Sequence, residues 1–170
     1  MDGRLEGVAP QAPVDDAFER STYWYPFALE GVRSLLEGLA QRHRQVILFG
    51  EIYGSGIQSL TYGLANRGIG FRAFDLLADG KYLDWHNFTA LCAEHNIEMV
   101  PTVATLPFNL GEIKRYSEGD TLLFADEPHM REGVVVKPTR ERSDPKVGRV
   151  ILKYVSDTYL FGDKTDFTDV

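Results

Sequence analysis

The pattern of apolar positions changes along the chain, from helical spacing in the first third to short runs further on. Residues 1–22 are rich in proline, glycine and acidic residues and show no apolar period, so we expect an irregular segment there. The spacing that follows predicts a helix from about residue 26 to residue 43. Its inner face is formed by Leu29, Val32, Leu35, Leu36 and Leu39.

Short apolar runs that end at glycine or aspartate predict buried strands. A strand end and a glycine-rich turn are expected at residues 51–56, and a polar loop at 138–147. The expected strands cover residues 46–49, 71–77, 99–103, 134–136 and 149–155.

Two further helices separate these strands. The first begins after Asp84, which can cap it, and ends near Asn96. A brief helix is expected at residues 110–116. Strands interleave irregularly with a few helices, which predicts an α+β fold of mostly antiparallel sheets with flanking helices rather than a βαβ series. The inner face of the helix after Asp84 is formed by Phe88, Leu91 and Cys92.

Composition and charge narrow the class of protein. The chain has 170 residues, of which 44% are hydrophobic, and this suits one domain with a sizeable core. The single cysteine, Cys92, excludes an internal disulfide, and no apolar run approaches the length of a membrane span or of a signal peptide. We therefore expect a soluble, cytoplasmic protein with no membrane partner.

The distribution of charge is more informative than its sum. A net charge of −7 argues against a protein that coats nucleic acid by bulk attraction. Residues 131–153, however, carry seven Lys or Arg against three acids. A local basic stretch on an acidic protein indicates a phosphate-handling site, with a solvated loop as the alternative.

Two stretches in the first half of the chain carry candidate site residues. Glu51 lies between glycines in FGEIYG at 49–54. Burial of an unpaired acid costs several kcal/mol, about 3–5 for a broken buried pair, so a sugar hydroxyl or an amide is expected to satisfy it. A turn acid that faces water is the alternative. Phe74 lies in FRAFD at 71–75, where an aromatic ring can stack on a purine base, worth about 1–3 kcal/mol, or can belong to the core.

Two stretches in the second half bring acids and lysines together. Glu132 and Lys137 bracket the apolar strand of EGVVVKP at 132–138. Acids at strand ends can hold a metal ion, and lysine can neutralise phosphate. Lys153 falls inside the apolar run RVILKY at 149–154, where it either points at a phosphate or reaches past apolar neighbours to water.

Taken together, the four stretches resemble motifs III, IIIa, IV and V of the covalent nucleotidyltransferases, which include ATP-dependent DNA and RNA ligases and mRNA capping enzymes. FGEIYG and EGVVVKP are most similar to the ATP-dependent RNA ligases that resemble the nick-sealing phage enzyme. The resemblance runs from about residue 23 to residue 160. It implies a partial, ATP-grasp-like nucleotidyltransferase domain at 23–160, preceded by the irregular segment at 1–22 and followed by a tail at 161–170.

The resemblance also implies a reaction. In that family a lysine attacks the α-phosphate of ATP and forms a lysyl–AMP adduct, AMP passes to an RNA 5′-phosphate, and a 3′-hydroxyl displaces AMP to seal the strand. The implied cofactors are ATP and Mg²⁺ or Mn²⁺. The implied partner is RNA with 5′-phosphate and 3′-hydroxyl ends, as in RNA repair.

By the same resemblance, Glu51 binds the ribose and Phe74 stacks on adenine. Glu132 supports metal binding and adenylation, Lys153 contacts the α-phosphate, and Lys137 belongs to the nucleotide-binding set. Glu132 and Lys153 are thus the implied catalytic residues. We expect Glu51, Phe74, Glu132 and Lys153 to converge on one cleft. Candidates for contact with RNA phosphates, or for a solvated loop, are Arg140, Arg142 and Lys146.

The chain departs from the family pattern at its start. The family's nucleophilic lysine lies in a K-x-(D/H)-G motif, whereas the first lysine of this sequence is Lys81 and only Met1-Asp2-Gly3 resembles the end of such a motif. Residues 4–22 lack the strand and the Ser/Arg-bearing motif that should follow. We therefore expect an N-terminally truncated chain that is inactive alone. The alternatives are a non-catalytic nucleotide- or RNA-binding module of the same fold and a DNA ligase.

Overall fold

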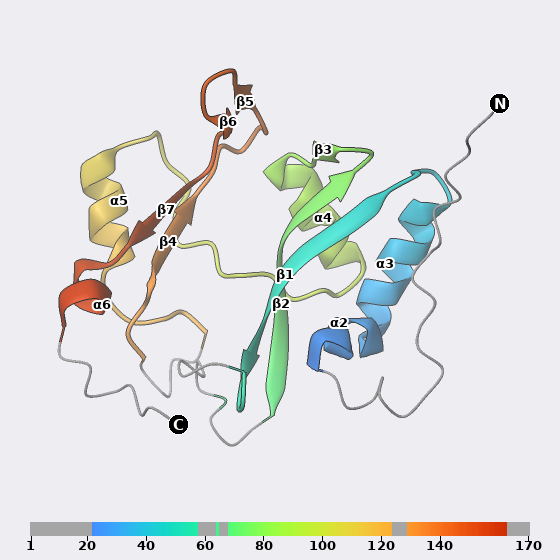
Figure 1. Ribbon diagram of the computed structural model, residues 1–170, viewed down its shortest axis with the longest axis horizontal. Coiled ribbons are helices and arrows are strands. Elements are labelled where there is room, and N and C mark those ends of the chain that lie inside the picture. Colours follow the sequence, from blue (N-terminus) through green and yellow to red (C-terminus); the bar gives the residue numbers. More distant parts are fainter. Residues whose placement is uncertain (1–21, 58–63, 65–67, 124–128, 163–170) are drawn as a thin grey trace.

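The computed structural model describes residues 22–57, 64, 68–123 and 129–162. Their helices and strands form two main sheets, each accompanied by its own helices, with a small hairpin beside the second sheet (Figure 1). Strand pairing within each sheet is antiparallel. The predicted α+β fold is confirmed.

The first sheet has the order β1-β2-β3. β1 (Val46–Gly54) and β2 (Ile69–Ala78) form its long antiparallel pair, and β3 (Lys81–Tyr82) pairs with the end of β2. β1 is longer than the pattern predicts. The strand continues through residue 54, where a strand end and a glycine-rich turn were expected, because each of residues 51–54 finds a partner in β2.

A β-bulge interrupts the pairing of β1 with β2. Phe49 pairs with Asp75 and Gly50 pairs with Ala73, so Phe74 is left without a partner. The alternation of buried and less buried positions stops at the same place, since Asp75 and the residue after it are both buried. Alternation holds from Phe71 through Asp75 and stops there, next to the extra residue at Phe74.

The N-terminal helical region is broken into three pieces. A 3-10 helix, η1 (Thr22–Trp24), leads into α2 (Tyr25–Ala28), and α3 (Glu30–Ala40) follows. The expected continuous helix is interrupted at Leu29, whose ψ of 118° is extended and whose N–H donates to the carbonyl of Pro26. Within the described residues no helix is long and apolar enough to cross a membrane.

α4 (Trp85–Glu94) lies on the same side of the sheet as α3, as the shared core shows. Asp84 was expected to cap it, but its carboxylate accepts the N–H of Glu141 instead, at 2.7 Å. Asn96 has a φ of 54°, which agrees with its predicted place at the helix end. The core between α3, α4 and the sheet consists of Val32, Leu35, Phe71, Ala73, Leu76, Phe88, Cys92 and Ile97.

The prediction of a strand at residues 99–103 is wrong. The N–H of Ala73 donates to the carbonyl of Glu98 at 2.9 Å, and the N–H of Val100 donates back to Ala73 at 3.0 Å. These bonds make an isolated parallel bridge rather than a strand. The pairing does not continue beyond this bridge among the described residues.

The second sheet consists of β4 (Gly133–Val136) and β7 (Leu152–Val155). α5 (Leu110–Ser117) packs against both strands and confirms the brief helix predicted there. α6 (Asp157–Phe161) follows β7 and was not predicted. The hydroxyl of the preceding residue, Ser156, caps its first turn.

A small hairpin occupies the segment that was expected to be a polar loop. β5 (Ser143–Asp144) and β6 (Gly148–Arg149) pair across a turn that contains Pro145. Asp144 accepts the N–H of Lys146 at 2.7 Å, and Gly148 adopts a φ of +75°, so aspartate, proline and glycine each suit their turn positions. Because β6 ends at Arg149, the single strand expected from residue 149 is divided into β6 and β7.

Candidate functional site

A carboxylate and an ammonium group meet at one end of the β4–β7 pair. Glu132 immediately precedes β4, and Lys153 lies in β7 opposite Val135. The Nζ of Lys153 lies 2.5 Å from the Oε1 of Glu132, in a charge-assisted hydrogen bond. These two residues, predicted for one site, are therefore in direct contact.

Gly133 makes this arrangement possible. A Cβ added at Gly133 would lie 2.2 Å from the carbonyl oxygen of Tyr154, so a side chain there would push β4 away from β7. The N–H of Ser156 donates to the carbonyl of Glu132 at 2.9 Å and continues the pairing beyond the strands. The backbone of Glu132 is thus fixed next to β7, within reach of Lys153.

The face of the sheet that carries Lys153 is open to solvent. Directly opposed residues of antiparallel strands project from the same face, so Val135 and Lys153 share it. Val135 is 60% exposed, and the side chain of Lys153 is 56% exposed. This surface offers a cation, a carboxylate and an apolar group to a ligand.

Glu51 and Phe74 lie on the other main sheet. Glu51 is exposed in β1, opposite Arg72 of β2, so it is neither a buried acid nor a turn acid. Phe74 is half-buried at the bulge and lies outside the buried core. Its ring is 6.4 Å from the ring of Phe49, at an angle of 30°. The bulge therefore gives this ring a position at the sheet surface.

A buried group of charges, which we name the Asp75 cluster, joins the two main sheets. It consists of Asp75, Lys137, Glu141 and Arg149. Asp75 is 2% exposed, and its two oxygens lie 2.6 Å from the Nζ of Lys137 and 2.9 Å from the Nη1 of Arg149. Removal of one partner from a buried ion pair costs about 3–5 kcal/mol, so the cluster holds β2 firmly against the segments that follow β4 and form β6.

Lys137 is engaged at the bulge. Besides its ion pair with Asp75, its ammonium donates to the carbonyl of Phe74 at 2.7 Å. It also lies 4.7 Å from the centroid of the Trp85 ring, in a cation–π contact. The residue that the resemblance assigned to nucleotide binding thus contacts the backbone of the proposed stacking residue.

Arg149 completes the cluster. Its Nε and Nη2 donate to the two carboxylate oxygens of Glu141 at 3.0 and 2.6 Å, and its guanidinium lies 3.6 Å from the centroid of the Tyr82 ring. The hydrogen bonds to Glu141, and then those to Asp75, raise the pKa of Arg149 above its usual range. The guanidinium is therefore charged at neutral pH.

Sequence patterns did not identify the Asp75 cluster. Glu141 and Tyr82 carried no recognised motif, and Asp75 was noted only as the neighbour of Phe74. The available signal was an acid within the apolar strand FRAFDLL, which requires a cation if it is buried. The sequence did not reveal which cation pairs with this acid, because Lys137 lies 62 residues further along the chain.

The predicted site residues therefore fall into two groups. Glu132 and Lys153 form one on the β4–β7 sheet, and Glu51 and Phe74 lie on the β1–β2 sheet. Lys137 connects the sheets through Asp75 and Phe74. The convergence of the two groups on one ligand stays a prediction.

The donors present suit a divalent metal ion that is shared with a ligand. Among the described residues no group of three His, Cys, Asp or Glu side chains gathers around one point. The carboxylate of Glu132 is 33% exposed, and Mg²⁺ is commonly held by one or two carboxylates together with phosphate oxygens and water. Glu132 fits as such a carboxylate ligand.

The described residues form an α+β domain with a lysine–carboxylate pair on one sheet and a surface aromatic ring on the other. The sequence matches the RNA ligase family over residues 4–155, and the chain belongs to that family. The match includes residues 4–22, which the motifs left outside the 23–160 domain; residues 4–21 lie outside the described part of the chain. A comparison with curated proteins gives no match.

Two solved structures have a similar fold, and both are lysine-to-alanine variants of Naegleria gruberi RNA ligase with ATP and Mn. The first has a TM-score of 0.61 and 25% identity, and covers 82% of this chain and 39% of the other. The second has a TM-score of 0.59 and 24% identity, and covers 80% and 37% respectively. The chain thus spans about two-fifths of the length of these relatives.

Proposed function

We propose that this chain forms the ATP-binding part of an ATP-dependent RNA ligase, with Mg²⁺ or Mn²⁺ as its metal. The observation that carries the proposal is the Glu132–Lys153 pair on an exposed sheet face, inside a segment that matches the RNA ligase family. The related ligase structures contain ATP and Mn, which supports the choice of nucleotide and metal.

The proposed reaction joins an RNA 5′-phosphate to a 3′-hydroxyl. A lysine nitrogen attacks the α-phosphorus of ATP and pyrophosphate leaves. An oxygen of the RNA 5′-phosphate then attacks the AMP phosphorus and releases the lysine. Finally the 3′-hydroxyl attacks the 5′-phosphate and AMP leaves. Each step transfers a phosphoryl or nucleotidyl group, so positioning and neutralisation of charge account for most of the catalysis.

The residues of this chain have distinct roles in the proposal. Lys153 neutralises charge on the α-phosphate, and Glu132 is a ligand of the metal, which lowers the cost of bringing negative charges together. Phe74 stacks on adenine and Glu51 accepts a hydrogen bond from a ribose hydroxyl. Lys137 acts through Phe74 and Asp75, as a positioning residue.

We propose further that the chain as given binds ATP without covalent attachment. Its first lysine, Lys81, lies in β3 directly after the Asp79-Gly80 turn and does not belong to a K-x-(D/H)-G stretch. The same observation favours the second candidate function, a non-catalytic nucleotide- or RNA-binding module of this fold. The two candidates make the same prediction for binding and differ only in whether a lysine supplied by a longer chain restores ligation.

Binding and adduct formation can be measured separately. We expect equilibrium dialysis with ATP and Mn²⁺ to show reversible binding, and denaturing electrophoresis after incubation with α-labelled ATP to show no labelled protein. Lys153→Met should weaken ATP binding by about tenfold or more, because a hydrogen bond to a charged group contributes about 1.5–3 kcal/mol.

The matched control is Lys146→Met, which removes the same charge from the exposed hairpin and should leave ATP binding unchanged. A labelled band that survives denaturation would show that another residue is the nucleophile. Absence of ATP binding by the unmodified chain, or equal effects of both substitutions, would contradict the proposed site.

A further inference from the structure

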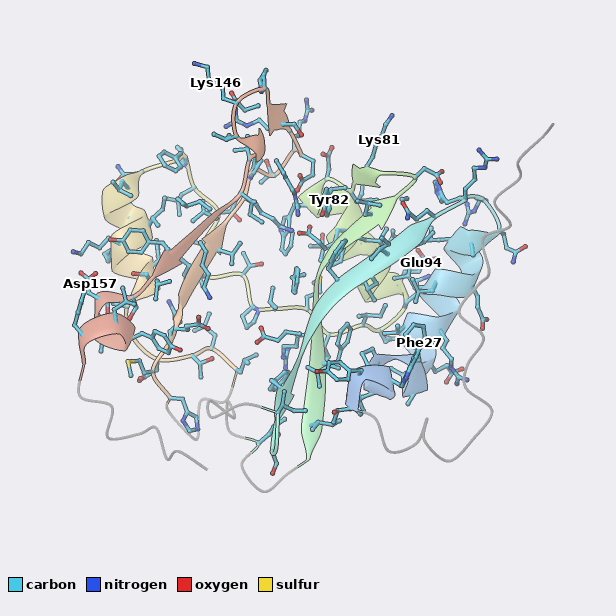
Figure 2. The ribbon with its side chains drawn as sticks, viewed as in Figure 1. Phe27, Lys81, Tyr82, Glu94, Lys146 and Asp157 are labelled. Carbon is cyan, nitrogen blue, oxygen red and sulfur yellow. The ribbon has the colours of Figure 1, made fainter. Side chains whose placement is uncertain are left out.

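The β5–β6 hairpin carries positive charges that neither the Asp75 cluster nor the Glu132–Lys153 pair uses. The side chains of Arg140, Arg142 and Lys146 are all exposed. Figure 2 shows Lys146 at the tip of the hairpin, where it points away from the rest of the molecule. We name these three residues the hairpin cations.

The acids of the same segment are already occupied. Glu141 binds the guanidinium of Arg149, and the Oδ1 of Asp144 accepts the N–H groups of Lys146 and Val147 at 2.7 and 3.3 Å. Within the part of the chain that is described, no hairpin cation forms a salt bridge with another residue. Their charge is therefore available to a ligand.

The hairpin is anchored at its base. Arg149 is held by Asp75 and Glu141, the N–H of Glu141 donates to Asp84 at 2.7 Å, and the N–H of Trp85 donates to the carbonyl of Thr139 at 3.0 Å. These contacts fix the base of the hairpin relative to β2 and α4. Charges presented by an anchored element lose less conformational entropy on binding than charges on an unattached loop.

Lys81 is a further exposed cation, in β3 of the first sheet. It directly precedes Tyr82, whose ring is covered by Arg149 at the base of the hairpin. In Figure 2 the side chains of Lys81 and Lys146 lie toward the same end of the molecule.

We propose that the hairpin cations, together with Lys81, form a surface that binds the phosphate backbone of RNA beside the candidate nucleotide site. Guanidinium and ammonium groups bind phosphate oxygens without reading the bases, so this surface holds RNA irrespective of sequence. Because the whole chain has a net charge of −7, RNA is attracted only to this local group of positive charges. The inference that this surface holds the substrate of the ligase rests on the proposed function. Binding of the RNA phosphate backbone to this surface does not depend on that function.

The test uses fluorescence anisotropy with a short, fluorescein-labelled single-stranded RNA at several salt concentrations. The triple variant Arg140→Ala, Arg142→Ala and Lys146→Ala should bind at least about tenfold more weakly at low salt. Each phosphate contact on a single strand contributes about 0.7 to the slope of log K against log salt, so three lost contacts should reduce that slope by about 2.

The matched control removes three exposed cations from the region of α3. They are Arg33, Arg42 and Arg44, each changed to alanine. Because both triple variants have the same net charge, equal losses of RNA binding would show bulk electrostatics and overturn the proposal. An unchanged slope in the hairpin variant would overturn it as well.

The same proteins are also tested for ATP binding by dialysis. The hairpin variant should retain the ATP affinity of the unmodified chain. If the unmodified chain binds RNA through the hairpin but binds no ATP, the proposed nucleotide site fails and the RNA surface stands. If it binds ATP but the hairpin variant binds RNA normally, the surface fails and the nucleotide site stands.

Discussion

Lys137 shows how the surroundings of one side chain set its role. Its ammonium contacts the carboxylate of Asp75 and the carbonyl of Phe74, which is the unpaired residue of the bulge. A bulge changes the direction of the strand and of the side chain that it displaces. Lys137 is therefore placed to hold the ring of Phe74 in one orientation.

We predict that Lys137→Met weakens binding of ATP but leaves binding of inorganic tripolyphosphate unchanged. Loss of the contact to Phe74 releases the stacking ring, and stacking of one base contributes about 1–3 kcal/mol. Isothermal titration calorimetry with both ligands measures the difference. Lys153→Met is the comparison variant, and it should weaken the binding of both ligands. If a Lys137→Met protein with an unchanged circular dichroism spectrum binds tripolyphosphate and ATP more weakly to the same extent, Lys137 contacts phosphate directly.

At the scale of elements, the β4–β7 pair depends on a close approach of two backbones. Gly133 has a φ of +155°, and an added Cβ would also lie 2.9 Å from the Cα of Val155. Every residue of β4 pairs with one of β7, so displacement at Gly133 affects the whole pair and the carboxylate of Glu132 that precedes it.

We predict that Gly133→Ala lowers the free energy of unfolding by about 1–3 kcal/mol, the usual cost of forced overpacking. The control is Gly38→Ala in α3, where an added Cβ meets nothing within 4 Å. That substitution should raise the free energy of unfolding by up to about 1 kcal/mol, because alanine favours the helix. Urea denaturation measures both. Equal effects of the two substitutions would show that the approach of β4 to β7 is not tight.

At the scale of the whole molecule, the pH dependence of stability includes contributions from two hydrogen-bonded carboxylates, Asp79 and Glu118. The pKa of Asp79 is lowered, first by the hydrogen bond with the His43 ring at 3.0 Å. The pKa of Glu118 is lowered, first by the hydroxyl of Thr158 at 2.6 Å. A carboxyl with a lower pKa in the folded state stabilises the fold above its ordinary pKa, and this stabilisation is lost as the pH falls through the lowered value.

We predict that the urea midpoint of the unmodified chain falls as the pH is lowered below about 4.5, near the ordinary carboxyl pKa values. The double variant Asp79→Asn and Glu118→Gln should be less stable at neutral pH and should lose less stability in acid. Circular dichroism during urea titration at several pH values provides the measurement. Parallel pH profiles for the two proteins would contradict this linkage.

Sequence patterns predicted the α+β class, the two long strands, α4, α5 and the proximity of Glu132 to Lys153. They failed at Leu29, at residues 99–103 and at the β5–β6 hairpin. Leu29 fits the helical period and nothing in its neighbours marks the break, so periodicity alone extends the helix through it. The hairpin did carry a local signal, since Asp144, Pro145 and Gly148 are typical of a turn, but the charges around it suggested an unstructured loop.

What the sequence determined by itself was local: the periods of its helices and strands, the turn residues, and the short motifs that resemble RNA ligases. Only the tertiary structure decided that Asp75 is neutralised by Lys137 and Arg149, that Phe74 lies at a bulge, and that Lys137 contacts the backbone next to that ring. The physical reason is that a period depends on neighbours three or four positions away, whereas a buried charge selects its partner from segments that the sheets bring together.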